Sequence, residues 1–397
     1  MTALTTSASK HTAMVSVKKL TKGCIALRIF QCALKWSCTV LNEPVPSKRQ
    51  DWIDISKGFG IVFVVVAHSM IPPMSDVLLE SVIFIITSFV MPLFFILAGM
   101  TYNSERHRRN LKNYAFSRGR QLLLPYFAIY IIMTLLFIPL TGSIDTYLTP
   151  GDLVFWLIYG AGPPGQPTYL WFLPVLYFGL MLFILIEAVT HAQDPRVRWP
   201  FVVILPFLAL WITDVFSPIL VPWRVNSVLF ATTFCIIGYE MKRYRGLERW
   251  STESKIRDGV IFIVLSTTFI LLSQYNGFVS HPDDWFGKNG WLYLLTGTSG
   301  TIAFFMISSL LNPSFFSKRM QFLGVNSQII YEIHPLFFYL VPILVSLFGF
   351  STTDYESTFT LFWSIRFVIA FGLSIPFTLL ILRNRGLSFI FTGYDSK

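Results

Sequence analysis

The sequence predicts an all-α polytopic membrane protein with about ten transmembrane helices. Of its 397 residues, 54% are hydrophobic and only 13% are charged, whereas soluble domains carry about 25% charged residues. The mean hydropathy is +0.60. A soluble chain of this length could not bury so much apolar surface, so a two-domain soluble enzyme is excluded. The 4 cysteines show neither the spacing of a zinc site nor that of a disulfide framework, and no metal site is predicted.

Apolar runs long enough to cross a bilayer follow one another from Ile55 onward, because a transmembrane helix needs about 20 apolar residues. Residues 1–47 are polar and then mixed, which predicts a cytoplasmic tail that is interfacial or disordered, and residues 48–397 form one membrane domain. The expected spans are residues 55–71, 81–101, 122–140, 170–190, 200–216, 225–241, 259–275, 291–311, 322–349 and 359–382.

The connecting loops carry positive charge in alternation. Lys and Arg cluster in 102–121 and 242–258, whereas 141–169 has none. By the positive-inside rule the basic loops face the cytoplasm, so both termini are expected there, in a multi-pass protein of the cell inner membrane. Arg198 is counted as a charge of the basic loop 191–199, and Arg224 as the single basic residue of the alternate loop 217–224. The net charge of +10 therefore reflects membrane orientation, and nucleic acid is not an expected partner.

Ionisable residues within the first apolar run are the main candidates for chemistry, because such residues are costly inside a membrane. Lys57 and His68 are eleven positions apart, which is about three helical turns plus 20°, so they share a face and lie roughly 16 Å apart along the axis. Asp54 lies within pairing distance of Lys57. Gly58 leaves room for a close backbone or a ligand. Two alternatives stay open: Lys57 as a snorkelling anchor and His68 as a helix–helix hydrogen bond.

Other polar and aromatic residues give weaker signals. Glu332 and His334 lie in an expected span, two positions apart, so they point to different sides of the helix. They could support catalysis or form an interhelical polar contact. Trp171 could stack on a sugar ring or belong to an interfacial aromatic belt. Asp283 and Asp284 are expected in a solvated external loop.

Five segments in order resemble the membrane-bound acyltransferase 3 family, and in particular its fucose 4-O-acetylase-like branch. The family pattern is a basic residue followed by ten others and a histidine, which Lys57 and His68 reproduce. The resemblance extends from residue 48 to about residue 385. The segments that carry it are Trp52–His68, Met91–Gly99, Arg118–Tyr126, Leu170–Pro174 and Phe322–His334.

The resemblance implies a membrane O-acyltransferase that moves an acetyl group from acetyl-CoA to a sugar hydroxyl of an exopolysaccharide, another surface glycan or a lipid-linked precursor. His68 would be the catalytic base and Lys57 its basic partner, while Arg118 and Arg120 would bind the donor. Family members often have two arginines separated by two residues, whereas here the position three after Arg118 is Gln121. No bound cofactor is expected, since acetyl-CoA acts as a substrate.

Acceptor binding or a supporting role is assigned to four residues: Asp54, Trp171, Glu332 and His334. The expected partners are acetyl-CoA, the glycan acceptor, the lipid bilayer and other glycan-assembly proteins. The alternative function is a transporter or flippase of a lipid-linked glycan, but the sequence lacks the paired repeats typical of transporters. A glycan polymerase is disfavoured because the longest external loop, 141–169, has no basic residue.

Overall fold

The computed structural model describes residues 51–70, 76–137, 149–161, 168–243, 255–310, 315–346 and 362–394. All described residues belong to one compact unit, Gln50–Lys397. The expected tail 1–47 therefore lies outside the described residues. In the described part every regular element is a helix, and strand pairing is limited to one isolated bridge.

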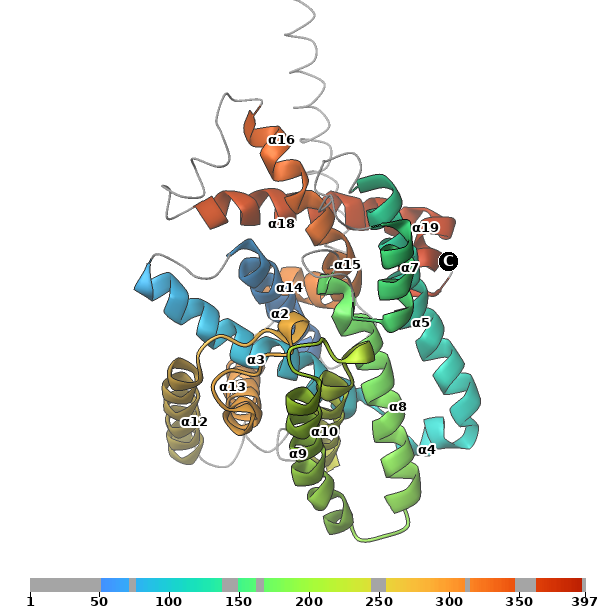
Figure 1. Cartoon of the computed structure of the whole chain (residues 1–397). Helices are drawn as coiled ribbons and strands as arrows, with labels where there is room; N and C mark the ends of the chain where they lie inside the picture. The colour runs from blue at the N-terminus through green and yellow to red at the C-terminus, as the bar shows by residue number, and fades with distance from the viewer. Residues whose placement is uncertain are drawn as a thin grey trace, which may run out of the picture. The chain divides into compact units, whose positions relative to one another are not determined.

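The all-α polytopic membrane fold is confirmed. Within the described residues, 7 helices are long and apolar enough to cross a membrane. They are α2 (Asp51–Ser69), α3 (Val77–Thr101), α8 (Phe172–Thr190), α9 (Trp199–Phe216), α12 (Lys255–Asn276), α13 (Gly290–Leu310) and α18 (Phe362–Arg383) (Figure 1). Two further long helices are more polar: α10 (Val225–Arg243) coincides with the expected span 225–241, and α5 (Leu111–Ile132) begins in the loop expected at 102–121 and covers only the first half of the expected span 122–140.

The expected single span 322–349 is wrong, because the chain breaks there into α14 (Phe315–Val325), α15 (Ser327–Phe338) and α16 (Leu340–Ser346). Asn326 interrupts the helix: its backbone leaves the helical region, and its side-chain amide donates to the Phe322 carbonyl at 2.8 Å. An asparagine side chain that bonds nearby backbone in this way competes with helix continuation.

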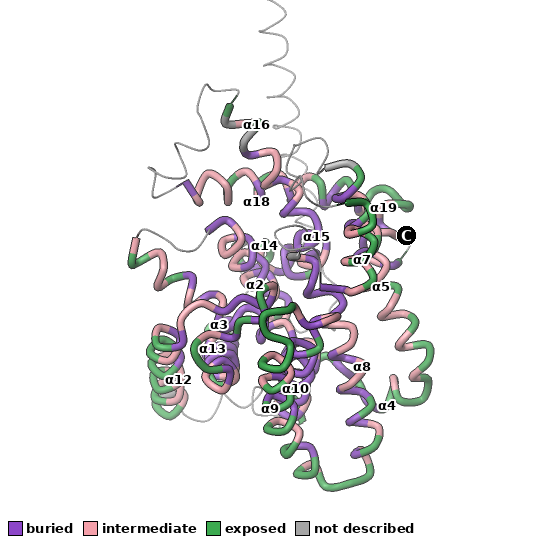
Figure 2. Tube along the Cα trace, viewed as in Figure 1, coloured by how far each residue is buried: buried purple, intermediate pink, exposed green. Residues whose placement is uncertain are grey.

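Shorter helices complete the described part. The external loop expected at 141–169 contains α7 (Pro150–Tyr159), which begins with a capping box formed by Thr149 and Asp152. Two others flank α5, namely α4 (Ser104–His107) and α19 (Arg385–Thr392). Buried residues concentrate on α2, α3 and α10, whereas α9 and α12 expose many apolar side chains (Figure 2). Exposed apolar side chains on spanning helices are the surface that lipid covers.

Helix α2 packs against α3, α13, α14, α15 and α18. Its contact with α14 is a backbone contact, since a Cβ added to Gly58 would overlap the Met320 carbonyl and one added to Gly324 would overlap the Asp54 carbonyl. Small residues allow such close approach of membrane helices. The space beside Gly58 is thus filled by backbone, and Gly58 does not open onto a ligand.

Two arginines that the sequence presents as loop charges are buried in ion pairs, one at each end of α10. Arg198 lies 2.6 Å from Glu240, and both side chains are 1% exposed. Arg224 lies 3.2 Å from Asp284, which is 8% exposed. The expectation that Asp284 is solvated is therefore wrong, because its carboxylate is paired inside the protein. Neither arginine contributes a free positive charge to its loop.

Candidate active site

The structure brings His68 of α2 against His334 of α15. Their ring atoms Nδ1 and Nε2 lie 2.8 Å apart, although 266 positions separate the residues in sequence. The two ring planes are almost parallel, at 8°. His334 is fully buried, whereas His68 is partly exposed. Of the two imidazoles, His68 is the one that a substrate can reach.

Hydrogen bonding fixes the proton positions of this histidine pair. The second nitrogen of His334, Nδ1, lies 3.0 Å from the Ile330 carbonyl oxygen. A carbonyl only accepts, so His334 carries its hydrogen on Nδ1 and a neutral ring has a lone pair on Nε2. His68 must then donate from Nδ1, which leaves its Nε2 unprotonated in the neutral ring. Among the described residues no polar atom forms a hydrogen bond with this Nε2, so it is free to accept a proton.

The helix turn before His334 is held by contacts with the start of α8. Tyr331 donates its hydroxyl hydrogen to the Tyr169 carbonyl oxygen. The Tyr331 ring also packs edge-on against Phe172, with centroids 5.2 Å apart. These contacts fix the rotation of α15 about its axis and so hold His334 toward α2.

Lys57 and Asp54 lie on α2, the same helix as His68. The helix is continuous over all three positions, so the eleven-residue spacing again corresponds to roughly 16 Å along its axis. Asp54 is 1% exposed, and Lys57 is partly exposed. Helix α14 packs against the N-terminal half of α2, where Gly324 meets the Asp54 carbonyl, and α15 contacts α2 farther along, where His334 meets His68.

A chain of side-chain hydrogen bonds connects Arg118 to Glu332. Arg118 Nη1 donates to Gln121 Oε1 at 2.5 Å, and Gln121 Nε2 donates to Gln328 Oε1 at 3.1 Å. Gln328 Nε2 then donates to Glu332 Oε1 at 2.9 Å. All three bonds point from the guanidinium to the carboxyl group, and aligned bonds of this kind polarise one another.

Glu332 is fully buried, and its second oxygen, Oε2, has no partner among the described residues. It lies two positions before His334, on the helix that carries the histidine pair. The hydrogen-bond chain therefore joins the arginine expected to bind the donor to α15, the helix that carries His334. Gln121, three positions after Arg118, is a link in this chain.

Arg120 has a different environment from Arg118. Its guanidinium lies over the rings of Phe389 and Tyr394, at 5.6 and 5.7 Å from their centroids. Arg120 is exposed, and these contacts link α5 to the C-terminal helix α19 and to Tyr394 after it. The structure thus places Arg118, but not Arg120, in the hydrogen-bond chain to Glu332.

Trp171 is 5% exposed, and its indole stacks on the ring of His281 with centroids 4.4 Å apart. The indole therefore offers no open face for a sugar. His281 and Gln328 were not singled out from the sequence. Gln328 lies four positions before Glu332, a spacing that could have revealed the pair. His281 gives no such signal, because it lies in a loop and its partners come from distant helices.

Comparison with protein families gives one match. A family model described as "Acyltransferase domain" matches residues 50–383. The match covers every segment that carries the resemblance seen in the sequence, including Lys57, His68, Arg118 and His334. No curated protein and no solved structure matches the chain.

Proposed function

This chain belongs to the acyltransferase 3 family, and we propose that it transfers an acetyl group from acetyl-CoA to a sugar hydroxyl. The acceptor is an exopolysaccharide, another surface glycan or its lipid-linked precursor, as in the fucose 4-O-acetylase-like branch. The enzyme acts in the inner membrane, with both termini in the cytoplasm. The charge alternation of the loops supports this orientation.

The observation that carries the proposal is the free Nε2 of His68. In the proposed reaction this nitrogen removes the proton from the sugar hydroxyl as the oxygen attacks the thioester carbonyl. The C–S bond breaks, the acetyl group passes to the sugar oxygen, and the CoA thiolate leaves and takes up the proton. His334 accepts the Nδ1 hydrogen of His68 throughout, so it holds the ring in the tautomer that the reaction requires.

In the proposed reaction, cationic side chains bind the acyl donor. Lys57 and Arg118 bind the phosphate groups of acetyl-CoA, since a guanidinium or an ammonium stabilises phosphate oxygens. We expect Lys57→Ala to raise the KM for acetyl-CoA while Lys57→Arg stays close to the wild type. Steady-state kinetics on purified protein measures this difference. A Lys57→Ala protein with an unchanged KM and kcat would leave only the anchoring role of Lys57.

Mass spectrometry of surface glycans tests the function itself. Cells that lack this chain should lose one acetyl group from the glycan repeat, and expression of the intact chain should restore it. Glycans with the same acetyl content in both strains would contradict the proposal. A loss of the whole glycan from the surface, without loss of acetyl groups from intracellular material, would indicate the transporter alternative.

A further inference from the structure

The corner between α3 and α5 forms a second polar site, on the side that the charge pattern assigns to the cytoplasm. Residues Tyr102 to Asn110 make this corner, and α4 begins there with the Asn103 side chain accepting from the Arg106 backbone N–H at 3.0 Å. Lys242, at the end of α10, donates to the Tyr102 carbonyl at 3.0 Å. The Tyr102 end of the corner is therefore fixed to α10.

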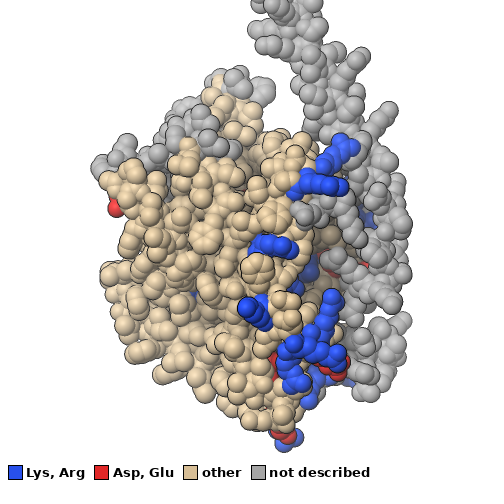
Figure 3. All heavy atoms as spheres, turned by 90° about the vertical axis from the view of Figure 1, so that its right-hand side faces the viewer, with Lys and Arg blue, Asp and Glu red and all other residues tan. Residues whose placement is uncertain are grey.

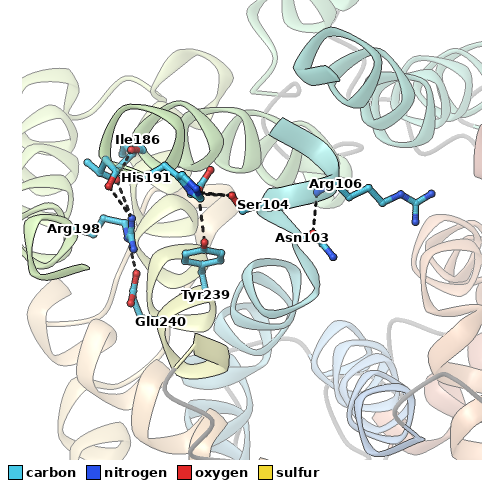
Figure 4. Close-up of polar contacts among 10 residues, drawn as sticks. Asn103, Ser104, Arg106, Ile186, His191, Arg198, Tyr239 and Glu240 are labelled. Atoms are coloured by element: carbon cyan, nitrogen blue, oxygen red, sulfur yellow. Dashed lines mark hydrogen bonds and ion pairs between the residues drawn. The ribbon is translucent and has the colours of Figure 1, made fainter. Parts of the chain in front are cut away.

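A buried network anchors this corner from beneath (Figure 4). Glu187 of α8 is fully buried, and its Oε1 lies 2.6 Å from the Ser104 hydroxyl and 2.7 Å from His191 Nδ1. Tyr239 also donates to this oxygen at 3.4 Å. The ion pair of Arg198 with Glu240 lies beside it, with the Arg198 guanidinium 5.4 Å from the centroid of the Tyr239 ring. Side chains that project from the corner are thus presented by a rigid base.

Three aromatic rings, those of Tyr102, His107 and Tyr114, contact one another in the corner. The His107 ring lies 4.4 Å from that of Tyr114 and 5.3 Å from that of Tyr102, between centroids. Tyr102 is 2% exposed, and its hydroxyl has no hydrogen-bond partner among the described residues. An unpaired hydroxyl in a buried position is costly. The base of the corner therefore contains one unsatisfied polar atom.

Cations surround these rings. The Arg118 guanidinium lies 5.3 Å from the centroid of the Tyr114 ring, and its Nε donates to the Tyr114 hydroxyl at 3.2 Å. Burial, followed by the charges of Arg118, Arg106 and Lys242, lowers the pKa of the His107 imidazole. Three cations therefore act on one neutral ring. Arg106 points out of the buried network (Figure 4), and Lys and Arg form a band on the side of α4, α5 and α19 (Figure 3).

We infer that the corner formed by Tyr102, Arg106, His107, Tyr114 and Lys242 binds the adenosine 3′,5′-bisphosphate end of an acyl-CoA. The cations match the phosphate groups, and the partly exposed rings of His107 and Tyr114, which are tilted by 43° to each other, supply aromatic surface for a purine base, which presents a π-face of its own. Arg118 belongs both to this corner and to the hydrogen-bond chain toward Glu332, so the corner is continuous with the donor site. The inference rests on the proposed function, because it assumes an acyl-CoA donor.

A comparison of two donors tests the corner. Acetyl-pantetheine carries the same thioester as acetyl-CoA but lacks the nucleotide. In Arg106→Ala and His107→Ala proteins, the KM for acetyl-CoA should rise about tenfold, as expected for loss of a charge-assisted contact, with kcat unchanged. The KM for acetyl-pantetheine should stay at the wild-type value. Equal changes for both donors, or no change for either, would overturn the inference.

The control variant is Lys288→Ala. Lys288 also places a cation near an aromatic ring, 5.4 Å from the centroid of Tyr275, but it lies in the loop between α12 and α13. Its removal should leave the KM for acetyl-CoA unchanged. An increase as large as that of Arg106→Ala would mean that any lost surface cation weakens the donor, and the specific corner would be refuted.

Adenosine 3′,5′-bisphosphate is a direct probe that does not depend on turnover. It should bind to purified wild-type protein by calorimetry and bind at least about tenfold more weakly to Arg106→Ala. The phosphate of an anionic lipid shares part of this chemistry, so binding is measured in nanodiscs with and without phosphatidylglycerol. Binding seen only without the anionic lipid would assign the corner to lipid headgroups and overturn the inference. If wild-type protein transfers no acetyl group but still binds the probe, the proposed function fails while the nucleotide corner stands.

Discussion

Two buried histidine sites in this molecule have opposite hydrogen-bond arrangements. His281 lies before α13, is 3% exposed and uses both ring nitrogens: Nδ1 lies 2.9 Å from the Ser227 hydroxyl and Nε2 2.8 Å from the Tyr293 hydroxyl. His68 is partly exposed and uses only Nδ1, toward His334. One imidazole is thus enclosed by its partners, and the other keeps a nitrogen for chemistry.

The kind of partner also differs between the two sites. A hydroxyl can donate or accept, so the neutral ring of His281 is satisfied in either tautomer. At the other site the Ile330 carbonyl only accepts, and it fixes the tautomer of His334 and through it that of His68. A buried histidine with flexible partners on both nitrogens stabilises the fold. A histidine whose partner sets the direction of its hydrogen bond is prepared to accept a proton.

The largest expected effect is that of His68→Gln. Loss of a general base typically lowers a rate by about 10²–10⁴, and glutamine cannot accept the proton at neutral pH. We expect such a loss in the release of free CoA from acetyl-CoA by membranes that contain the native glycan. Size-exclusion profile and thermal unfolding should match those of the wild type. Near-normal release by folded His68→Gln protein would make His68 a packing residue like His281.

His334→Leu should have the next largest effect, about 10- to 100-fold on kcat, because it removes the acceptor that holds the His68 tautomer. His334→Gln should recover part of this loss, since its amide oxygen can accept the Nδ1 hydrogen. The same CoA-release assay measures both variants. Equal activity of the leucine and glutamine variants would show that the hydrogen bond between the two rings has no role in catalysis.

His281→Phe should instead lower stability and leave activity per folded molecule unchanged. The substitution leaves the hydroxyls of Ser227 and Tyr293 without their partner, and each such loss costs about 1–3 kcal/mol. Thermal unfolding in detergent should therefore occur at lower temperature. A large loss of turnover in the folded fraction would contradict the structural role of His281.

The pH dependence of the unfolding temperature tests the structural role of His281 in a second way. Burial, and next Arg224, lower the pKa of His281 to about 3, whereas an exposed histidine titrates near about 6.5. The unfolded chain therefore takes up a proton between these values while the folded chain does not, and stability falls as the pH drops through this window. His281→Phe removes this contribution, so its unfolding temperature should decline less steeply below about pH 6.5. An identical decline in both proteins would contradict the assigned titration.

The smallest expected effect concerns the hydrogen-bond chain from Arg118 to Glu332, beside the His68–His334 pair. Gln328→Met removes the link between Gln121 and Glu332 and should lower kcat less than about tenfold, the scale of one hydrogen bond. Gln274→Met is the matched control, because Gln274 also makes an interhelical bond, to the Ser81 carbonyl at 2.9 Å. Activity per folded molecule should be unchanged in the control. The same kcat loss in both variants would show that the hydrogen-bond chain acts only as a packing contact.

The sequence predicts the membrane fold and the shared helix of Lys57 and His68, because apolar length and helical spacing are local properties. It does not predict that His334 meets His68, since that contact depends on how α14 packs against α2 through Gly58 and Gly324 and on the break at Asn326 after which α15 begins. The positive-inside pattern counts Arg198 as a loop charge for a similar reason. Its carboxylate partner, Glu240, lies on another helix and becomes visible only in the folded chain.

The most direct test of the central claim compares His68→Gln with His281→Phe in cells. Acetyl content of the surface glycan is measured by mass spectrometry and divided by the amount of folded protein in the membrane. Our interpretation predicts wild-type acetylation per folded molecule for His281→Phe and no detectable acetylation for His68→Gln. Acetylated glycan in the His68→Gln strain, at the wild-type level per folded molecule, would contradict the assignment of His68 as the base.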